Sequence, residues 1–160
     1  MAVHYRKDEL AYYQNIQEEI AADVATVYSY LASNKISEWF PELSFKVING
    51  AEALVFDMGE GEAALAFEIL EQRENELIKF QWDEGLVTLS LEATESGSVL
   101  TLEEQMPLSQ DVEQTANDFV GWYFQMQNIQ TISETGDPAE LDLVDFMALE
   151  AEVLESLENL

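Results

Sequence analysis

The spacing of apolar residues predicts a strand followed by two short helices in the first quarter of the chain. Along residues 10–20 the apolar side chains are separated by even intervals, which is typical of a half-buried strand. Asp23 is expected to cap a first helix, whose apolar residues recur every three or four positions. A second short helix should end before Pro41, because proline disfavours helical geometry in the residue that precedes it.

The middle of the chain has the pattern of short strands joined by tight turns. Six strands are expected, over residues 45–48, 53–58, 62–72, 77–82, 86–94 and 98–106. The breaks between them are rich in Gly, Asn and Asp, as in the loops that join antiparallel neighbours. Residues 86–94 alternate most clearly, which gives that strand one apolar and one polar face.

The last third is predicted to be helical. A long helix is expected after Asp111, with Gln114 in the position that completes a capping box. Asp137 and Pro138 are the expected start of a final acidic amphipathic helix that runs to the end of the chain. The order indicates an α+β fold, with a seven-stranded antiparallel sheet and a long helix to cover its concave face. We divide the chain into a domain of residues 1–136 and a helical extension of residues 137–160.

Charge and composition narrow the classes of function. The 160 residues include 33 Asp and Glu but only 6 Lys and Arg, a formal net charge of −27. Binding to nucleic acid or to an anionic membrane requires basic clusters, so we expect neither. The chain has no Cys and a single His, which disfavours thiol chemistry and the usual metal sites. We expect no catalytic residue, metal or cofactor. With no apolar signal segment at the N-terminus, the expected location is cytoplasmic.

Several short motifs resemble a known family. They are Ile20-Ala21-Ala22-Asp23-Val24, Val27-Tyr28, Trp39-Phe40-Pro41, a strand that ends at Trp82, and Val120-Gly121-Trp122. Their order over residues 8–135 resembles the activator of heat-shock-protein ATPase homologue family, in the START-like, pollen-allergen-like superfamily. The resemblance implies a helix-grip fold, in which a curved sheet wraps around a long C-terminal helix and leaves a cavity. Members of that superfamily bind lipids, hormones or other apolar molecules there, and some are enzymes.

A set of large apolar residues is the expected lining of such a cavity, together with one carboxylate. The predicted pocket residues are Trp39, Phe40, Phe56, Phe67, Phe80, Trp82, Leu89, Leu102, Glu104, Phe119, Trp122 and Met126. Pockets are mostly apolar with few polar groups, which fits this set. The alternative is that the same side chains pack a solid core.

Glu104 is the polar residue with the most specific expected role in the pocket. Alternation places it on the same face as Leu102 and Met106, where a carboxylate is costly unless it is hydrogen-bonded, protonated or used. It would then anchor a polar group of a ligand. The alternative is a β-bulge or an early strand end that turns Glu104 to water. Asp57 and Glu68 are expected to face solvent, and His4 to lie in a frayed terminus without a role.

Three hypotheses of function follow. The first is a cytoplasmic protein that binds an apolar or weakly polar small molecule between the sheet and the long helix. The second is an interaction module, co-chaperone-like by family analogy, in which residues 137–160 dock on a second copy or on a basic protein partner. That segment can instead dock on its own domain, over Phe124 and Ile132, with Gly121 permitting close approach. The third is a cyclase or hydrolase, which the lack of a nucleophile motif or phosphate loop disfavours.

Overall fold

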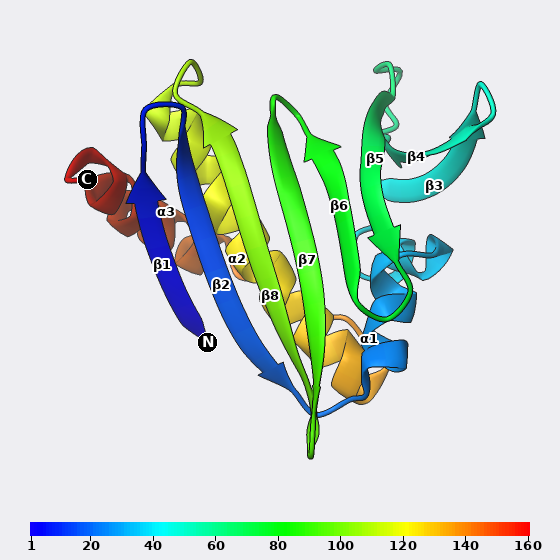
Figure 1. The fold of residues 1–160 in the computed structure, drawn as a ribbon. Coiled ribbons are helices and arrows are strands. Elements are labelled where there is room, and N and C mark those ends of the chain that lie inside the picture. The colour runs from blue at the N-terminus through cyan, green and yellow to red at the C-terminus, as the bar shows by residue number, and fades with distance from the viewer.

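One curved antiparallel sheet forms the body of the molecule, and all 160 residues are described by this computed structural model. The strands are β1 (Ala2–Lys7), β2 (Ala11–Ile20), β3 (Leu43–Ile48), β4 (Ala51–Phe56), β5 (Leu65–Arg73), β6 (Leu77–Trp82), β7 (Gly85–Thr94) and β8 (Gly97–Pro107). They lie in the order β1-β2-β8-β7-β6-β5-β4-β3 (Figure 1). The meander from β3 to β8 therefore closes against the N-terminal hairpin.

The helices lie on one side of this sheet. They are α1 (Val24–Leu31), the 3-10 helix η1 (Asn34–Glu38), α2 (Val112–Thr135) and α3 (Leu143–Glu158). Figure 1 shows α2 running obliquely across the sheet, with α3 beside β1. This arrangement confirms the expected α+β class and the helix-grip architecture. None of the helices combines the length and apolarity that a membrane crossing requires.

The predicted helix caps are largely confirmed. The carboxylate of Asp23 accepts a hydrogen bond from the amide of Thr26 at 2.8 Å, and Asp111 caps α2. The capping box is not formed, because the Gln114 amide donates to Asp118 within the helix instead. Gly136 ends α2 in a left-handed conformation, which glycine adopts without steric cost.

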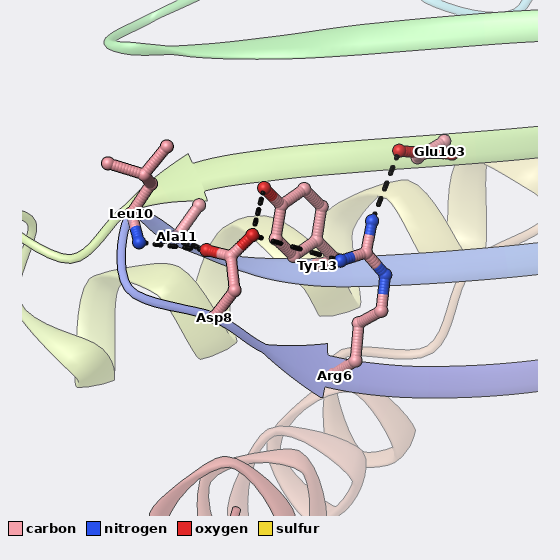
Figure 2. Close-up of polar contacts among 6 residues, drawn as sticks. All are labelled: Arg6, Asp8, Leu10, Ala11, Tyr13 and Glu103. Carbon is pink, nitrogen blue, oxygen red and sulfur yellow. Dashed lines mark hydrogen bonds and ion pairs between the residues drawn. The ribbon is translucent and has the colours of Figure 1, made fainter.

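The sheet has eight strands rather than seven, because the N-terminus is not frayed. Residues 2–7 form β1, with His4 exposed in it, paired with Asn15. Figure 2 shows how the hairpin is fixed: Asp8 Oδ1 accepts from the amides of Leu10 and Ala11 at 2.8 and 2.9 Å. These hydrogen bonds and that of the Tyr13 hydroxyl lower the pKa of Asp8. A polar edge strand of this kind has little apolar periodicity, so the hydrophobic pattern did not predict it.

The final helix starts later than predicted. Its N-cap is Asp142, whose side chain accepts from the amide of Val144 at 2.8 Å, and not Asp137. Residues 137–142 form a connection that is tied back to α2, since the Ala139 amide donates to Asn128 Oδ1 at 2.8 Å. The segment contains two residues suited to cap a helix, Asp137 and Asp142. The hydrogen bond between Ala139 and Asn128 holds the chain between them in a non-helical connection, so the helix begins after Asp142.

Two hydrophobic clusters fill the space between the sheet and the helices. The larger one lies between the sheet, α1 and the second half of α2, and includes Trp122, Met126 and Ile129. The smaller one joins the first half of α2 to α3 and includes Phe119, Phe124 and Leu157. In this structure α3 thus docks on its own chain, through Phe124 as expected. Ile132 instead belongs to the larger cluster, away from α3.

Candidate functional site

An aromatic cluster occupies the space between β6, η1 and α2. Trp82 lies at its centre, with ring centroids 5.2 Å from Trp122 and 5.3 Å from Phe67. Phe40, Phe56 and Phe80 surround the same indole at 5.9 to 6.2 Å, mostly edge to face. Such geometry is favourable for aromatic pairs, and it packs six rings against one another. Around Trp82, the residues predicted to line a pocket therefore largely form a packed core.

Polar contacts of the backbone hold the cluster in place. The Asn128 side chain donates to the carbonyl oxygen of Trp39 at 2.7 Å, which fixes the end of η1 against α2 and thereby positions Phe40. Trp39 Nε1 in turn donates to the Tyr30 carbonyl at 3.0 Å. Gly85 pairs with Trp82, and a Cβ there would overlap the carbonyl oxygen of Gln105. Only glycine permits β7 to approach β8 this closely.

A small recess opens beside the aromatic cluster. Its volume is about 110 Å³, and Phe40, Trp82 and Trp122 form its aromatic wall. The other lining residues come from the exposed side of α2 and from α3; they are Asn117, Asp118, Gly121, Gln125 and Phe146. Phe146 stacks on Phe124 with a centroid distance of 5.8 Å, so α3 forms one wall. We call this space the aromatic recess.

The aromatic recess includes two polar groups in unusual environments. Trp122 Nε1 is buried and donates to no acceptor, although buried indole N–H groups usually have a partner. Burial raises the pKa of Asp118, and the nearby Asp83 carboxylate adds to this, while a hydrogen bond from Gln110 opposes it. The Trp122 N–H is itself buried, so a ligand could accept from it only if the lining of the aromatic recess moves.

Gly121 has a different role from the one expected. It was predicted to let α3 approach α2 closely, yet a Cβ at Gly121 would meet no heavy atom within 4 Å. That prediction is wrong, because α3 contacts the helix through Phe124 and Phe146 rather than at the glycine. Gly121 instead leaves open space in the lining of the aromatic recess.

Glu104 lies inside the protein, as alternation requires. It is fully buried in the regular part of β8, between Gln14 of β2 and Val87 of β7. The alternative of a bulge or an early strand end is wrong; the sheet irregularity lies in β5, between Ile69 and Glu71. Glu104 Oε1 accepts from Gln14 Nε2 at 3.4 Å, and the same amide donates to the Phe119 carbonyl at 2.9 Å.

The Glu104 carboxyl is held toward its neutral form. Burial raises its pKa well above the ordinary value, the Asp118 charge raises it further, and the Gln14 hydrogen bond opposes both. Glu104 Oε2 and Gln14 Oε1 are both buried without a partner. A proton on Oε2 turns one of these two acceptors into a donor, which favours a neutral acid beside the amide. Glu104 is 0% exposed, and its expected role as a ligand anchor stays a prediction.

The predicted pocket residues divide into three groups. Phe40, Trp82 and Trp122 line the aromatic recess. Most of the others pack in or against the larger cluster, namely Trp39, Phe56, Phe67, Phe80, Leu89, Leu102 and Met126. Phe119 belongs to the smaller cluster, stacked at 6.2 Å on Tyr5. Asp57 and Glu68 are exposed, as expected.

Five lining residues of the aromatic recess were not predicted. Asp118 and Gln125 are polar positions flanking the apolar stripe of α2, and Phe146 lies in the final helix, which was predicted only as amphipathic. Sequence periodicity identifies the apolar face of a helix, but it does not show which other helix packs at the edge of that face. The one signal in the sequence was that Asp118 and Gln125 lie four residues before and three residues after Trp122, and so share its side of the helix with apolar residues.

The chemistry offered by this region is that of a binding site. The aromatic recess presents aromatic rings and a carboxyl group with a raised pKa, and the Trp122 N–H is buried behind this lining without an acceptor. No group of three or more His, Asp or Glu side chains is arranged to hold a metal ion.

Comparison with known proteins supports the fold. No family model and no curated protein matches the sequence. Among solved structures, EF2215 of Enterococcus faecalis, a conserved protein of unknown function, is 23% identical with a TM-score of 0.85, over 98% of this chain and 91% of that one. CalU16 of Micromonospora echinospora is 21% identical with a TM-score of 0.67, over 97% and 92%.

An AHSA1-like protein, RHE_CH02687 of Rhizobium etli, is 18% identical with a TM-score of 0.62, over 81% of this chain and 86% of that one. Identities this low establish a shared fold and nothing about activity. The chain therefore has the helix-grip fold that the sequence motifs implied.

Proposed function

We propose that this protein binds a small apolar or weakly polar molecule at the aromatic recess, between β6, α2 and α3. The observation that carries the proposal is a preformed wall of Phe40, Trp82 and Trp122 that also contains a buried N–H without an acceptor. Aromatic walls with one or two oriented polar groups are typical of small-molecule sites. A flat ligand with one acceptor atom would fit both features.

The size of the recess limits how such a ligand binds. Sites that enclose a drug-sized ligand have volumes of roughly 300–1,000 Å³, whereas this one has about 110 Å³. One ring of a ligand fits inside, and the rest lies outside or displaces Phe146. α3 can yield there because its buried residues are Val153 and Leu157, near its other end.

The proposal is tested with a neutral fluorescent naphthylamine, N-phenyl-1-naphthylamine, whose binding is not biased by the net charge of −27. Gly121→Leu places a side chain in open space and should leave the fold intact, while it fills the recess. We expect the Kd of the probe to rise at least about tenfold, equivalent to about 1.4 kcal/mol.

The matched control is Glu113→Leu, which adds the same side chain at an exposed position of α2. It should change the Kd by less than about twofold, or about 0.4 kcal/mol. Equal binding by the wild type and Gly121→Leu, with circular dichroism showing both folded, would refute binding at the aromatic recess.

A second function is favoured by a separate observation on α3. Leu141, Leu143, Val144 and Met147 are 48 to 73% exposed and lie close together along the chain. We propose that this α3 patch docks a basic protein segment with apolar side chains. Glu140, Asp142 and Asp145 are exposed around it, and a second copy of a chain with charge −27 would be repelled.

A synthetic amphipathic helix of Leu and Lys is the probe for the α3 patch. Met147→Ser should weaken its binding at least about tenfold, and high salt should weaken it further. Val47→Ser is the control, because Val47 is also 73% exposed but lies on β3. Equal losses for both variants would show general attraction to the acidic surface, and a concentration-dependent dimer in ultracentrifugation would identify a second copy as the occupant.

A further inference from the structure

A wide hollow lies away from the aromatic recess. It is an open groove of about 870 Å³ between the start of the β1–β2 hairpin and the middle of α2. Its polar lining includes Glu18 of β2 and Gln127, Gln130 and Thr131 of α2, while Gln17 and Glu19 border it from strand positions whose side chains point to the other face of the sheet. Small or apolar residues make up the rest, and no basic side chain contributes. We call it the Glu18 groove.

Glu18 is the unusual residue of this groove. Alternation along β2 puts it on the same side as Ile16 and Ile20, which are 0 and 2% exposed, and Glu18 itself is only 5% exposed. Its Oε2 atom is buried and accepts no hydrogen bond. A carboxylate oxygen in this state normally has a donor, so a residue that lines the groove contains a buried acceptor without a partner.

The charges around Glu18 leave it without a partner. Glu134 lies close enough to raise its pKa, although its own Oε2 accepts from the Ala21 amide at 2.8 Å. Glu19 contacts α2 through its backbone, where its carbonyl oxygen accepts from Gln130 Nε2 at 3.0 Å. The amino group of Met1 acts in the opposite direction, yet burial dominates and the pKa of Glu18 is raised to about 7. A bound cation would remove this penalty.

We propose that the Glu18 groove binds a small organic ammonium compound, such as an aliphatic diamine, whose N–H groups donate to the Glu18 carboxylate. The amide and hydroxyl oxygens of Gln127, Gln130 and Thr131 are further acceptors. Anions are disfavoured by the carboxylates of Glu18 and Glu134. A metal ion is disfavoured because no three ligating side chains converge. This site is separate from the aromatic recess, and neither proposal depends on the other.

The test is calorimetric titration with 1,4-diaminobutane at pH 8 and low salt. We expect Glu18→Gln to raise the Kd at least about tenfold, equivalent to about 1.4 kcal/mol. Glu62→Gln is the matched control, because it removes the same charge from an exposed position in the β4–β5 loop. Its effect should stay below about twofold.

Two further readouts separate a site from general attraction to an acidic surface. When 1,4-diaminobutane is added to the wild type, the backbone NMR shift changes should concentrate at Gln127, Gln130 and Thr131. This measurement does not depend on whether a variant folds. Because Glu18 must lose its proton to bind an ammonium group, affinity should fall as the pH drops below about 7, and Glu18→Gln should remove that dependence. Equal effects of both variants, shifts scattered over α3, or no binding would each overturn the proposal.

Discussion

The layer between the sheet and α2 is built differently at its two ends. Around Trp82 and Trp122, aromatic rings pack edge to face and leave a recess of about 110 Å³. Around Glu18, amide and carboxyl groups line a groove of about 870 Å³. Rings can fill space against one another, whereas polar groups that need hydrogen-bond partners keep a surface open to water. Helix α2 thus packs against aromatic rings in one region and borders a groove open to water in the other.

Truncating one α2 side chain at each end of this layer should give the largest difference in the free energy of unfolding. Trp122→Ala removes a ring that is 2% exposed and should lower the free energy of unfolding by about 3–5 kcal/mol. Gln127→Ala, on the same helix but in the groove, should change it by less than about 0.5 kcal/mol. Urea unfolding measures both values. Similar losses would mean that the groove residues are as tightly packed as the rings, which contradicts the comparison.

The buried acid between the two ends should control the pH dependence of stability. The pKa of Glu104 is higher in the folded protein than in the unfolded chain, so the folded state holds its proton more tightly. The free energy of unfolding should therefore fall as the pH rises from the ordinary carboxyl range toward the folded pKa, by about 1.36 kcal/mol for each unit of the shift.

Glu104→Gln isolates this effect, because the amide resembles the neutral acid and does not titrate. The variant should be more stable than the wild type at pH 8 and should lose its advantage near pH 4. Glu92→Gln, at an exposed position, corrects for the general relief of negative charge. Parallel stability curves for the wild type and Glu104→Gln would show that Glu104 is already ionised in the folded state.

The wall that α3 adds to the aromatic recess should be weaker than the core beneath it. Phe146→Ala removes the stack on Phe124 and should cost about 1–2 kcal/mol, with faster amide hydrogen exchange along α3. Met147→Ala is the neighbouring control, since Met147 is 63% exposed. If Phe146→Ala left exchange in α3 unchanged, α3 would be held by Val153 and Leu157 alone.

The smallest effect is expected at Gly121. Replacement by Ala adds a methyl group in open space and reduces the freedom of the unfolded chain, so stability should rise by about 0.5–1 kcal/mol. The melting temperature in calorimetry measures this. A fall in melting temperature would mean that the recess closes over Gly121 in solution.

The elements with strong local signals were predictable from the sequence. Alternation in residues 86–94 identified β7, and Asp23 and Asp111 were correctly identified as helix caps. The strand β1 was missed because its stability comes from pairing with β2 and from the Asp8 turn, neither of which produces an apolar pattern. The start of α3 was misplaced because a contact with Asn128, distant in sequence, decides it.

The candidate site was predictable to a smaller extent. Period-two alternation correctly placed Glu104 inside the protein, and the large aromatic residues were correctly expected in the interior. Their division into a packed cluster and a recess could not be predicted, because it depends on how the rings interlock and on where α3 lies. Glu18 was missed although the same alternation that located Glu104 also points it inward.

The most direct test of the proposed function is the indole region of a proton–nitrogen NMR spectrum, recorded while N-phenyl-1-naphthylamine is added. Binding at the aromatic recess predicts saturable shifts of the Trp82 and Trp122 indole signals. Trp39 is an internal reference, because its Nε1 donates to the Tyr30 carbonyl and it does not line the recess. Unchanged Trp82 and Trp122 signals, with shifts confined to Val144 and Met147, would contradict the account and place the ligand on the α3 patch.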